Sequence, residues 1–257
     1  MLYQVKSYLK FFIGSTNAHG VHSPFVYDLV TQCFYDKTKY PAYEILVEHR
    51  KNLLALVQTI KITDFGKGSR VFKSNEREVS AIAKHAGVNA KRQRLLFRLV
   101  RYFSSENVLE LGTSVGLASA ALALGNLEGS LTTLEGCPET SEVARKQFEK
   151  FKWKHIRLYT TTFERFFDTT PATSFDLVYV DGNHSKENTL AYFDALLSLK
   201  SNDTVLIFDD IYWSPEMTEA WEQIYTHEQV TVSIDSFHWG LIFFRKEQPK
   251  QHFRIRL

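Results

Sequence analysis

Residues 108–117 of the chain read Val108-Leu-Glu-Leu-Gly-Thr-Ser-Val-Gly-Leu117. An apolar run that ends in a glycine-containing segment predicts a strand, a tight turn and the start of a helix. Glycines at 112 and 116 let a backbone approach a ligand closely, and the first turn of a helix offers unpaired N–H groups. This turn is therefore the first candidate for a ligand-binding site.

The segments after residue 105 alternate between strand and helix. Strands are expected at residues 107–111, 130–135, 155–159, 175–181, 204–209, 230–234 and 240–244. Alternation with short turns implies a parallel sheet covered by helices on both faces, whereas the last two strands are close enough to form an antiparallel hairpin. The sequence therefore predicts an α/β fold with an antiparallel last strand.

The first hundred residues have a mainly helical pattern. Ser23-Pro24 is typical of a helix N-terminus, and the two glycines of residues 63–70 indicate a loop. We expect two parts, a helical N-terminal extension of residues 1–89 and a core of residues 90–257. Arg94, Arg98 and Arg101 share one side of a helix, which is either a solvated face or a stripe for phosphate.

The totals exclude several classes of protein. The 257 residues carry a formal net charge of +2, so there is no bulk electrostatic case for nucleic acid or membrane binding. No stretch approaches the roughly 20 apolar residues that span a bilayer, and the N-terminus lacks the pattern of a signal peptide. The two cysteines, Cys33 and Cys137, indicate reduced thiols, which favours a cytoplasmic location.

Three chemistries could use the turn at 110–116. Dinucleotide binding favours G-x-G-x-x-G, and this turn has Ser114 where a middle glycine might stand. A serine hydrolase could use Ser114 in G-x-S-x-G with Asp209 and His238, but the residues before it look helical. Binding of S-adenosylmethionine needs close backbone approach and a carboxylate for the ribose hydroxyls, which Glu135 could supply at the end of the next strand. The glycines and the two acids together favour this third interpretation.

Glu110-x-Gly112-x-x-x-Gly116 followed by Glu135 resembles the first two motifs of the class I methyltransferases. The resemblance covers residues 90–246, and the absent middle glycine is shared with catechol O-methyltransferase-like enzymes. It implies a Rossmann-like seven-stranded sheet that binds S-adenosylmethionine. The residues that the resemblance assigns to the cofactor are Glu110, Gly112, Thr113, Ser114, Gly116, Glu135, Thr162, Phe163 and Asp181, with Thr162 and Phe163 near the adenine.

Carboxylates follow the fourth and fifth strands at Asp181 and at Asp209-Asp210. In a parallel sheet these ends face the ligand crevice, and gathered carboxylates suit Mg²⁺. The resemblance to metal-dependent O-methyltransferases supports these three residues as ligands, although Asp209 could instead cap a helix. His184 lies where the related enzymes carry a catalytic lysine and could act as the general base, with Asp181 beside it.

The sequence thus predicts O-methylation of a small-molecule acceptor, with or without Mg²⁺. Tyr212 and Trp213 could line the acceptor pocket, and the N-terminal helices could close over it. The alternatives are a non-catalytic cofactor-binding or RNA-interacting module, an RNA methyltransferase and, more remotely, a serine hydrolase. The oligomeric state stays open, a homodimer included.

Overall fold

The computed structural model describes residues 2–63, 65, 74–169 and 173–257, so most of the loop predicted at 63–70 lies outside the described residues. The chain forms two compact units. The continuous unit comprises residues 37–169, and the split unit comprises residues 1–36 together with 170–257. Each unit is described by itself below.

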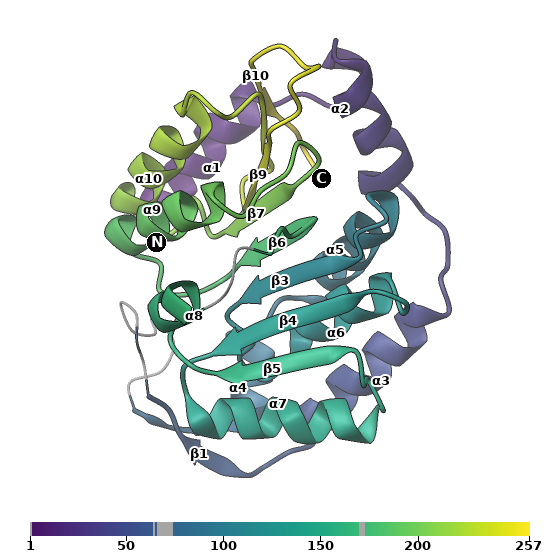
Figure 1. Cartoon of the computed structure of the whole chain (residues 1–257), viewed down its shortest axis with the longest axis vertical. Coiled ribbons are helices and arrows are strands. Elements are labelled where there is room, and N and C mark those ends of the chain that lie inside the picture. Colours follow the sequence, from purple (N-terminus) through teal and green to yellow (C-terminus); the bar gives the residue numbers. More distant parts are fainter. Residues whose placement is uncertain (1, 64, 66–73, 170–172) are drawn as a thin grey trace. The chain divides into compact units, whose positions relative to one another are not determined.

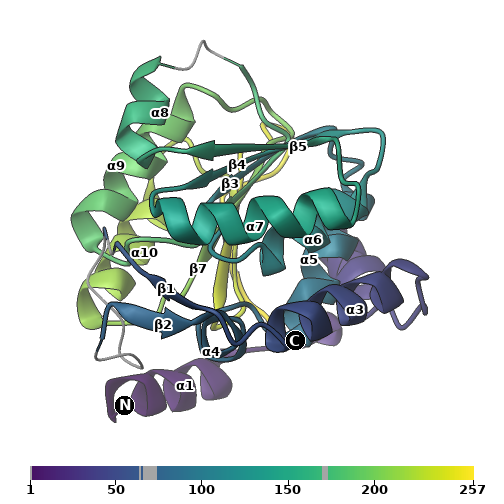
Figure 2. The same ribbon diagram turned by 90° about the horizontal axis from the view of Figure 1, so that it is seen from below.

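The continuous unit contains a three-stranded parallel sheet in which β4 lies between β3 and β5. Helix α7 contacts β4 and β5, and α6 packs against α5 and β4 (Figure 1). A two-stranded antiparallel sheet of β1 and β2 lies beside α4 (Figure 2). The elements of this unit are α3 (Ala42–Leu54), β1 (Thr59–Lys61), β2 (Glu76–Glu78), α4 (Val79–His85), α5 (Ala90–Tyr102), β3 (Asn107–Leu111), α6 (Leu117–Gly125), β4 (Ser130–Glu135), α7 (Pro138–Lys150), β5 (Ile156–Thr160) and α8 (Phe163–Thr169).

The split unit contains five paired strands. β6 and β7 are parallel, β9 runs antiparallel to both β7 and β8, and β10 is parallel to β8. In Figure 1, α9 and α10 lie on one side of these strands and α2 on the other. The elements are α1 (Leu2–Gly14), η1 (Ala18–Gly20), α2 (Pro24–Asp28), the π-helix η2 (Leu29–Phe34), β6 (Leu177–Val180), α9 (Lys186–Leu197), β7 (Val205–Asp209), α10 (Pro215–Thr226), β8 (Val232–Asp235), β9 (Trp239–Phe243) and β10 (Gln251–Arg254).

The seven predicted strands are confirmed, each within two residues at both ends, and so is the closing antiparallel hairpin of β8 and β9. Local chemistry explains several boundaries. The Ser23 hydroxyl accepts a hydrogen bond from the Val26 amide at the start of α2, and the Asn89 side chain accepts one from the Arg92 amide at the start of α5. Strands β1, β2 and β10 were not predicted, because short, partly exposed segments have a weak period-two pattern.

Helix α6 is buried along its whole length. Its sequence, Leu-Ala-Ser-Ala-Ala-Leu-Ala-Leu-Gly, consists of apolar and small residues, which suits a helix that is covered on all sides. At Gly125 an added Cβ would lie 2.5 Å from the Val100 side chain of α5. The small residues therefore let α5 and α6 approach closely behind the strand that leads into the glycine turn.

A buried carboxyl group lies at the centre of the continuous unit. Glu110 of β3 is fully buried, and its Oε2 accepts hydrogen bonds from the hydroxyls of Ser119 in α6 and Thr133 in β4. The hydroxyls of Thr133 and Thr113 share a further hydrogen bond. Burial raises the pKa of Glu110 from 4.5 to about 7, against the lowering effect of the two hydroxyl donors. These bonds tie strand, turn and helix together.

The raised pKa of Glu110 predicts a pH-dependent stability. Because the folded state favours the neutral acid, the contribution is fully present below about pH 4.5 and is lost as the pH rises through about 7. The predicted loss is on the order of 3 kcal/mol. Urea unfolding of the ligand-free protein between about pH 5 and pH 8 measures it.

Glu110→Gln should remove this loss, so its stability relative to the unchanged protein rises as the pH rises. Glu142→Gln is the matched control, because Glu142 is exposed on α7 and forms ion pairs with its helix neighbours Arg145 and Lys146. Equal pH slopes for Glu110→Gln and the unchanged protein would show that Glu110 is already ionised in the fold.

Candidate functional site

The turn between β3 and α6 has the backbone geometry that its glycines predict. Gly112 and Gly116 have φ values of +106° and +89°, in the left-handed region that favours glycine. The amides of Gly112 and Thr113 both donate to the carbonyl of Leu134 in β4, each at 3.0 Å. The turn is therefore held against the end of the neighbouring strand.

Gly116 is also restricted by close packing. A Cβ at this position would lie 2.8 Å from the ring of Phe148 in α7, which is closer than real side chains approach. Gly116 thus combines a left-handed backbone with a contact that leaves no room for a side chain. Its amide donates to the Thr113 carbonyl at 2.9 Å and closes the turn.

The Glu135 carboxylate lies at the end of β4, next to this turn. One oxygen accepts a hydrogen bond from the Ser114 amide at 2.7 Å, and the other accepts one from the Cys137 amide at 2.9 Å. The Thr140 side chain and the Gly136 amide also hydrogen-bond to this carboxylate. Its two oxygens have four lone pairs in all, with which it accepts hydrogen bonds from the protein and from a ligand. Burial raises the pKa of Glu135, although the backbone donors act in the opposite direction. Glu135 is thus positioned to accept two ligand hydroxyls, while Ser114 supplies a backbone donor.

Thr162 and Phe163 lie after β5, as predicted. Thr162 is at the start of α8, where its hydroxyl accepts a weak bond from the Arg165 amide at 3.4 Å. Phe163 is the first residue of α8 and is half-buried. Their contact with an adenine ring stays a prediction.

In the split unit, one buried hydroxyl connects the carboxylates that follow β6 and β7. The Tyr179 hydroxyl lies 2.6 Å from Oδ2 of Asp209 and 3.2 Å from Oδ2 of Asp181, and it donates to the nearer oxygen. The other Asp209 oxygen accepts from the Asp210 amide at 2.7 Å. Asp181 and Asp209 are therefore brought together, as the sequence predicts for the ends of neighbouring parallel strands.

His184 lies beside Asp181. Its Nε2 is 3.7 Å from Oδ1 of Asp181, and its ring stacks on Trp213 with 5.5 Å between ring centroids. Asn183, His184 and Asp210 all have positive φ values, of 66°, 47° and 54°. Left-handed backbone at non-glycine residues costs free energy and concentrates at functional sites. The strain after both strands supports this edge as a site of chemistry.

Of the three carboxylates predicted to bind a metal ion, Asp181 and Asp209 lie close to each other. Among the described residues, no group of three His, Cys, Asp or Glu side chains is arranged to hold a metal ion. Asp181 and Asp209 share the Tyr179 hydroxyl, while Asp210 is joined to Asp209 through its backbone amide. A site of Asp181, Asp209 and Asp210 stays a prediction.

Tyr212 and Trp213, which could both line an acceptor pocket, have different surroundings. Trp213 stacks on His184, whereas the Tyr212 hydroxyl donates to Asp235 at 2.6 Å and its ring stacks on Phe237. Sequence reasoning did not single out Tyr179. The signal available was a tyrosine two residues before Asp181 in an otherwise aliphatic strand.

The three arginines of α5 contact aromatic side chains. Arg94 lies over the Tyr43 ring at 5.0 Å, Arg101 lies over Tyr40 at 5.1 Å, and Arg98 donates to the Tyr43 hydroxyl at 3.2 Å. Cation–π contacts of this kind stabilise the packing of α5 against residues 40–43. They favour a structural role for these arginines over a phosphate-binding stripe.

No helix of the described residues is long and apolar enough to cross a membrane.

Comparisons with known proteins agree with this geometry. Residues 109–211 match a family model described as a methyltransferase domain. Over 126 residues the chain is 30% identical to a catechol O-methyltransferase from Mycobacterium tuberculosis, covering 48% of this chain and 56% of that protein. A mouse catechol O-methyltransferase domain-containing protein is 30% identical over 138 residues, covering 51% of this chain and 52% of that protein. The chain thus spans about half the length of the curated relatives it matches.

Solved structures show the same fold. A Podospora anserina methyltransferase with bound S-adenosylhomocysteine has a TM-score of 0.63 at 16% identity, covering 88% of this chain and 97% of that one. The matched segment includes the turn after β3, Glu135 at the end of β4, Asp181 and Asp209. Residues 109–211 are thus similar to a methyltransferase domain, and the chain has the Rossmann-like α/β fold of the solved methyltransferases.

Proposed function

We propose that the chain transfers a methyl group from S-adenosylmethionine to a hydroxyl group of a small-molecule acceptor. The observation that carries the proposal is the Glu135 carboxylate, held by one backbone amide on each oxygen beside the turn of Gly112 and Gly116. The domain match, and the cofactor product bound to a protein of the same fold, support it.

The residues of the continuous unit suit this cofactor. Glu135 has lone pairs for two ribose hydroxyls, and charge-assisted bonds of this kind contribute about 1.5–3 kcal/mol each. Gly112 and Gly116 supply the left-handed backbone of the turn, and a position without a Cβ at Gly112 lets a ligand approach the backbone. Glu110, Thr113 and Ser114 hold or form the turn. We assign the adenine end to Thr162 and Phe163.

The residues of the split unit suit an acceptor hydroxyl. When bound, the cofactor supplies an electrophilic methyl group on a sulfonium sulfur. The acceptor oxygen would take this methyl group as the carbon–sulfur bond broke, and its hydroxyl proton would pass to a base. We assign this role to an imidazole nitrogen of His184, because Asp181 at 3.7 Å offsets the positive charge that the ring gains. Trp213 supports the ring from one side.

Positioning of the reactants lowers the activation barrier further. Methyl transfer needs alignment of oxygen, carbon and sulfur, and well-oriented reactants gain on the order of 7–11 kcal/mol in ideal cases. The buried Tyr179 hydroxyl holds Asp209, and the contacts with Asp181 and Trp213 position the imidazole of His184. We include Asp181 among the proposed cofactor contacts, since it directly follows strand β6.

The first prediction for this proposal concerns the base. His184→Asn should lower kcat for methyl transfer by about 100-fold while the KM for S-adenosylmethionine changes little. The assay measures S-adenosylhomocysteine formation with a panel of hydroxyl acceptors that includes catechol, a simple phenol and a sugar. His238→Asn is the matched control, because His238 is an exposed histidine of the same unit.

The panel also separates the alternatives. A serine hydrolase would depend on His238 and Ser114 and would produce no S-adenosylhomocysteine. Binding of S-adenosylhomocysteine without methyl transfer to any member of the panel would favour the non-catalytic module. Equal kcat values for His184→Asn and the unchanged enzyme would remove His184 from the reaction.

The second prediction concerns Mg²⁺. This ion usually keeps several waters and binds through one or two carboxylates, so Asp181 and Asp209 fit as ligands, with Asp210 as a third. The ion would polarise the acceptor hydroxyl, and no step described above passes through it. Excess EDTA should lower the rate by at least about tenfold, and added Mg²⁺ should restore it. Full activity in EDTA would show that the carboxylates act without a metal.

A further inference from the structure

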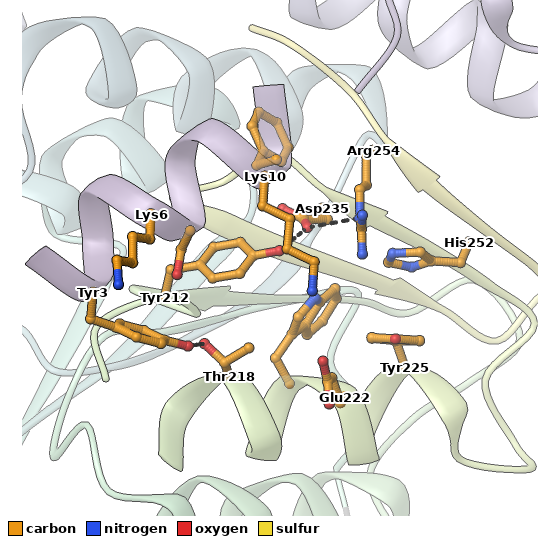
Figure 3. A pocket seen from close by; sticks show the side chains of 13 residues that line it. Tyr3, Lys6, Lys10, Tyr212, Thr218, Glu222, Tyr225, Asp235, His252 and Arg254 are labelled. Carbon is orange, nitrogen blue, oxygen red and sulfur yellow. Dashed lines mark hydrogen bonds and ion pairs between the residues drawn. The ribbon is translucent and has the colours of Figure 1, made fainter. Parts of the chain in front are cut away.

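The split unit contains a cavity that is lined by residues of α1, α10, β8 and β10 and by Tyr212 (Figure 3). Its volume is about 270 Å³, near the lower end of the range for small-molecule sites. Of the described residues that line it, none is Asp181, His184, Asp209 or Asp210. The cavity is therefore separate from the residues assigned to the acceptor.

Two buried N–H donors of this cavity have no acceptor among the described residues. They are Nε of Arg254 in β10 and the indole nitrogen of Trp221 in α10. Arg254 Nε lies 3.7 Å from the Asp235 carboxylate, which is an ion pair but is too long for a hydrogen bond. Buried donors without acceptors cost free energy, so both nitrogens favour a ligand that brings acceptor atoms.

The charges of the cavity favour an anion. Lys6 and Lys10 lie one turn apart on α1 and line the cavity together with Arg254 (Figure 3). The Asp235 carboxylate is already engaged, since it accepts from the Tyr212 hydroxyl at 2.6 Å and from the Phe237 amide at 2.8 Å. Three cationic side chains thus face one engaged carboxylate and Glu222.

The walls are flat and aromatic. The rings of Tyr225 and His252 stack at 4.2 Å with 19° between their planes. Burial, with Arg254 nearby, lowers the pKa of His252 to about 4, so the ring is neutral near pH 7. Its Nδ1 shares a hydrogen bond with the Ser233 hydroxyl. Together with Tyr212, these rings offer surfaces on which a planar ligand ring can stack.

We propose that this cavity binds a small aromatic carboxylate, with its ring among Tyr212, Tyr225 and His252 and its carboxylate among Lys6, Lys10 and Arg254. The cations neutralise the anion, and the unpaired donors supply hydrogen bonds to its oxygens. The proposal does not rest on the methyl-transfer function, because none of the described residues assigned to the cofactor, the base or the metal lines the cavity. Tyr212, which the sequence also suggests for an acceptor pocket, lines this cavity.

The experiment is a calorimetric titration of the full chain with benzoate at about pH 7, with benzyl alcohol as the neutral analogue of similar shape. Benzoate should bind with a dissociation constant below about 1 mM, and benzyl alcohol should bind at least about tenfold more weakly. The double variant Lys6→Gln/Lys10→Gln should weaken benzoate binding by about tenfold or more. Both lysines are exposed, so the fold tolerates the change.

Two controls locate the binding site. Lys84→Gln/Lys91→Gln makes the same charge change at exposed lysines of the continuous unit and should leave the benzoate affinity within about twofold. His184→Asn should also leave it unchanged, which separates the cavity from the acceptor residues. Equal affinity for benzoate in the Lys6/Lys10 variant, equal binding of benzyl alcohol, or no benzoate binding would each overturn the proposal.

Discussion

The pair of hydrogen bonds that holds the Glu135 carboxylate is the interaction on which the candidate site depends. The Ser114 amide belongs to the turn after β3, and the Cys137 amide belongs to the start of α7. A single side chain therefore joins two strand ends and a helix start. The bonds from Gly112 and Thr113 to Leu134 bring the backbones together, and the buried Glu110 fixes the same strands from within. These hydrogen bonds hold the Glu135 carboxylate beside the glycine turn.

Much of the fold could be predicted from the sequence, because long apolar strands and glycine turns are local signals. Strand β3 and the turn to Gly116 are examples, since both glycines that the pattern singled out have positive φ values, as does Ser114 between them. The pairing of Asp181 with Asp209 was also predictable, because parallel strands place their carboxyl ends at one edge. The comparisons support the resemblance, because residues 109–211 match a family model described as a methyltransferase domain.

Other features depend on contacts that a linear pattern does not contain. Tyr212 and Trp213 are neighbours in the chain, yet one bonds to Asp235 and the other stacks on His184. Both residues follow Asp210, whose φ is positive, in a turn where the Trp213 amide donates to the Asp210 carbonyl. Glu110 looked like a cofactor residue, and only the fold shows it buried among hydroxyl groups. The cavity shown in Figure 3 is lined by residues of α1 and β10, which are far apart in sequence.

We infer that Glu135 and the neighbouring glycine turn form a site for S-adenosylmethionine. Calorimetric titration with S-adenosylhomocysteine tests it most directly, because binding is measured without an acceptor or a metal. We expect micromolar binding to the unchanged protein and to Glu142→Gln, at least about tenfold weaker binding to Glu135→Gln, and no detectable binding of NAD⁺. Undiminished affinity in Glu135→Gln, or tighter binding of NAD⁺ than of S-adenosylhomocysteine, would contradict it.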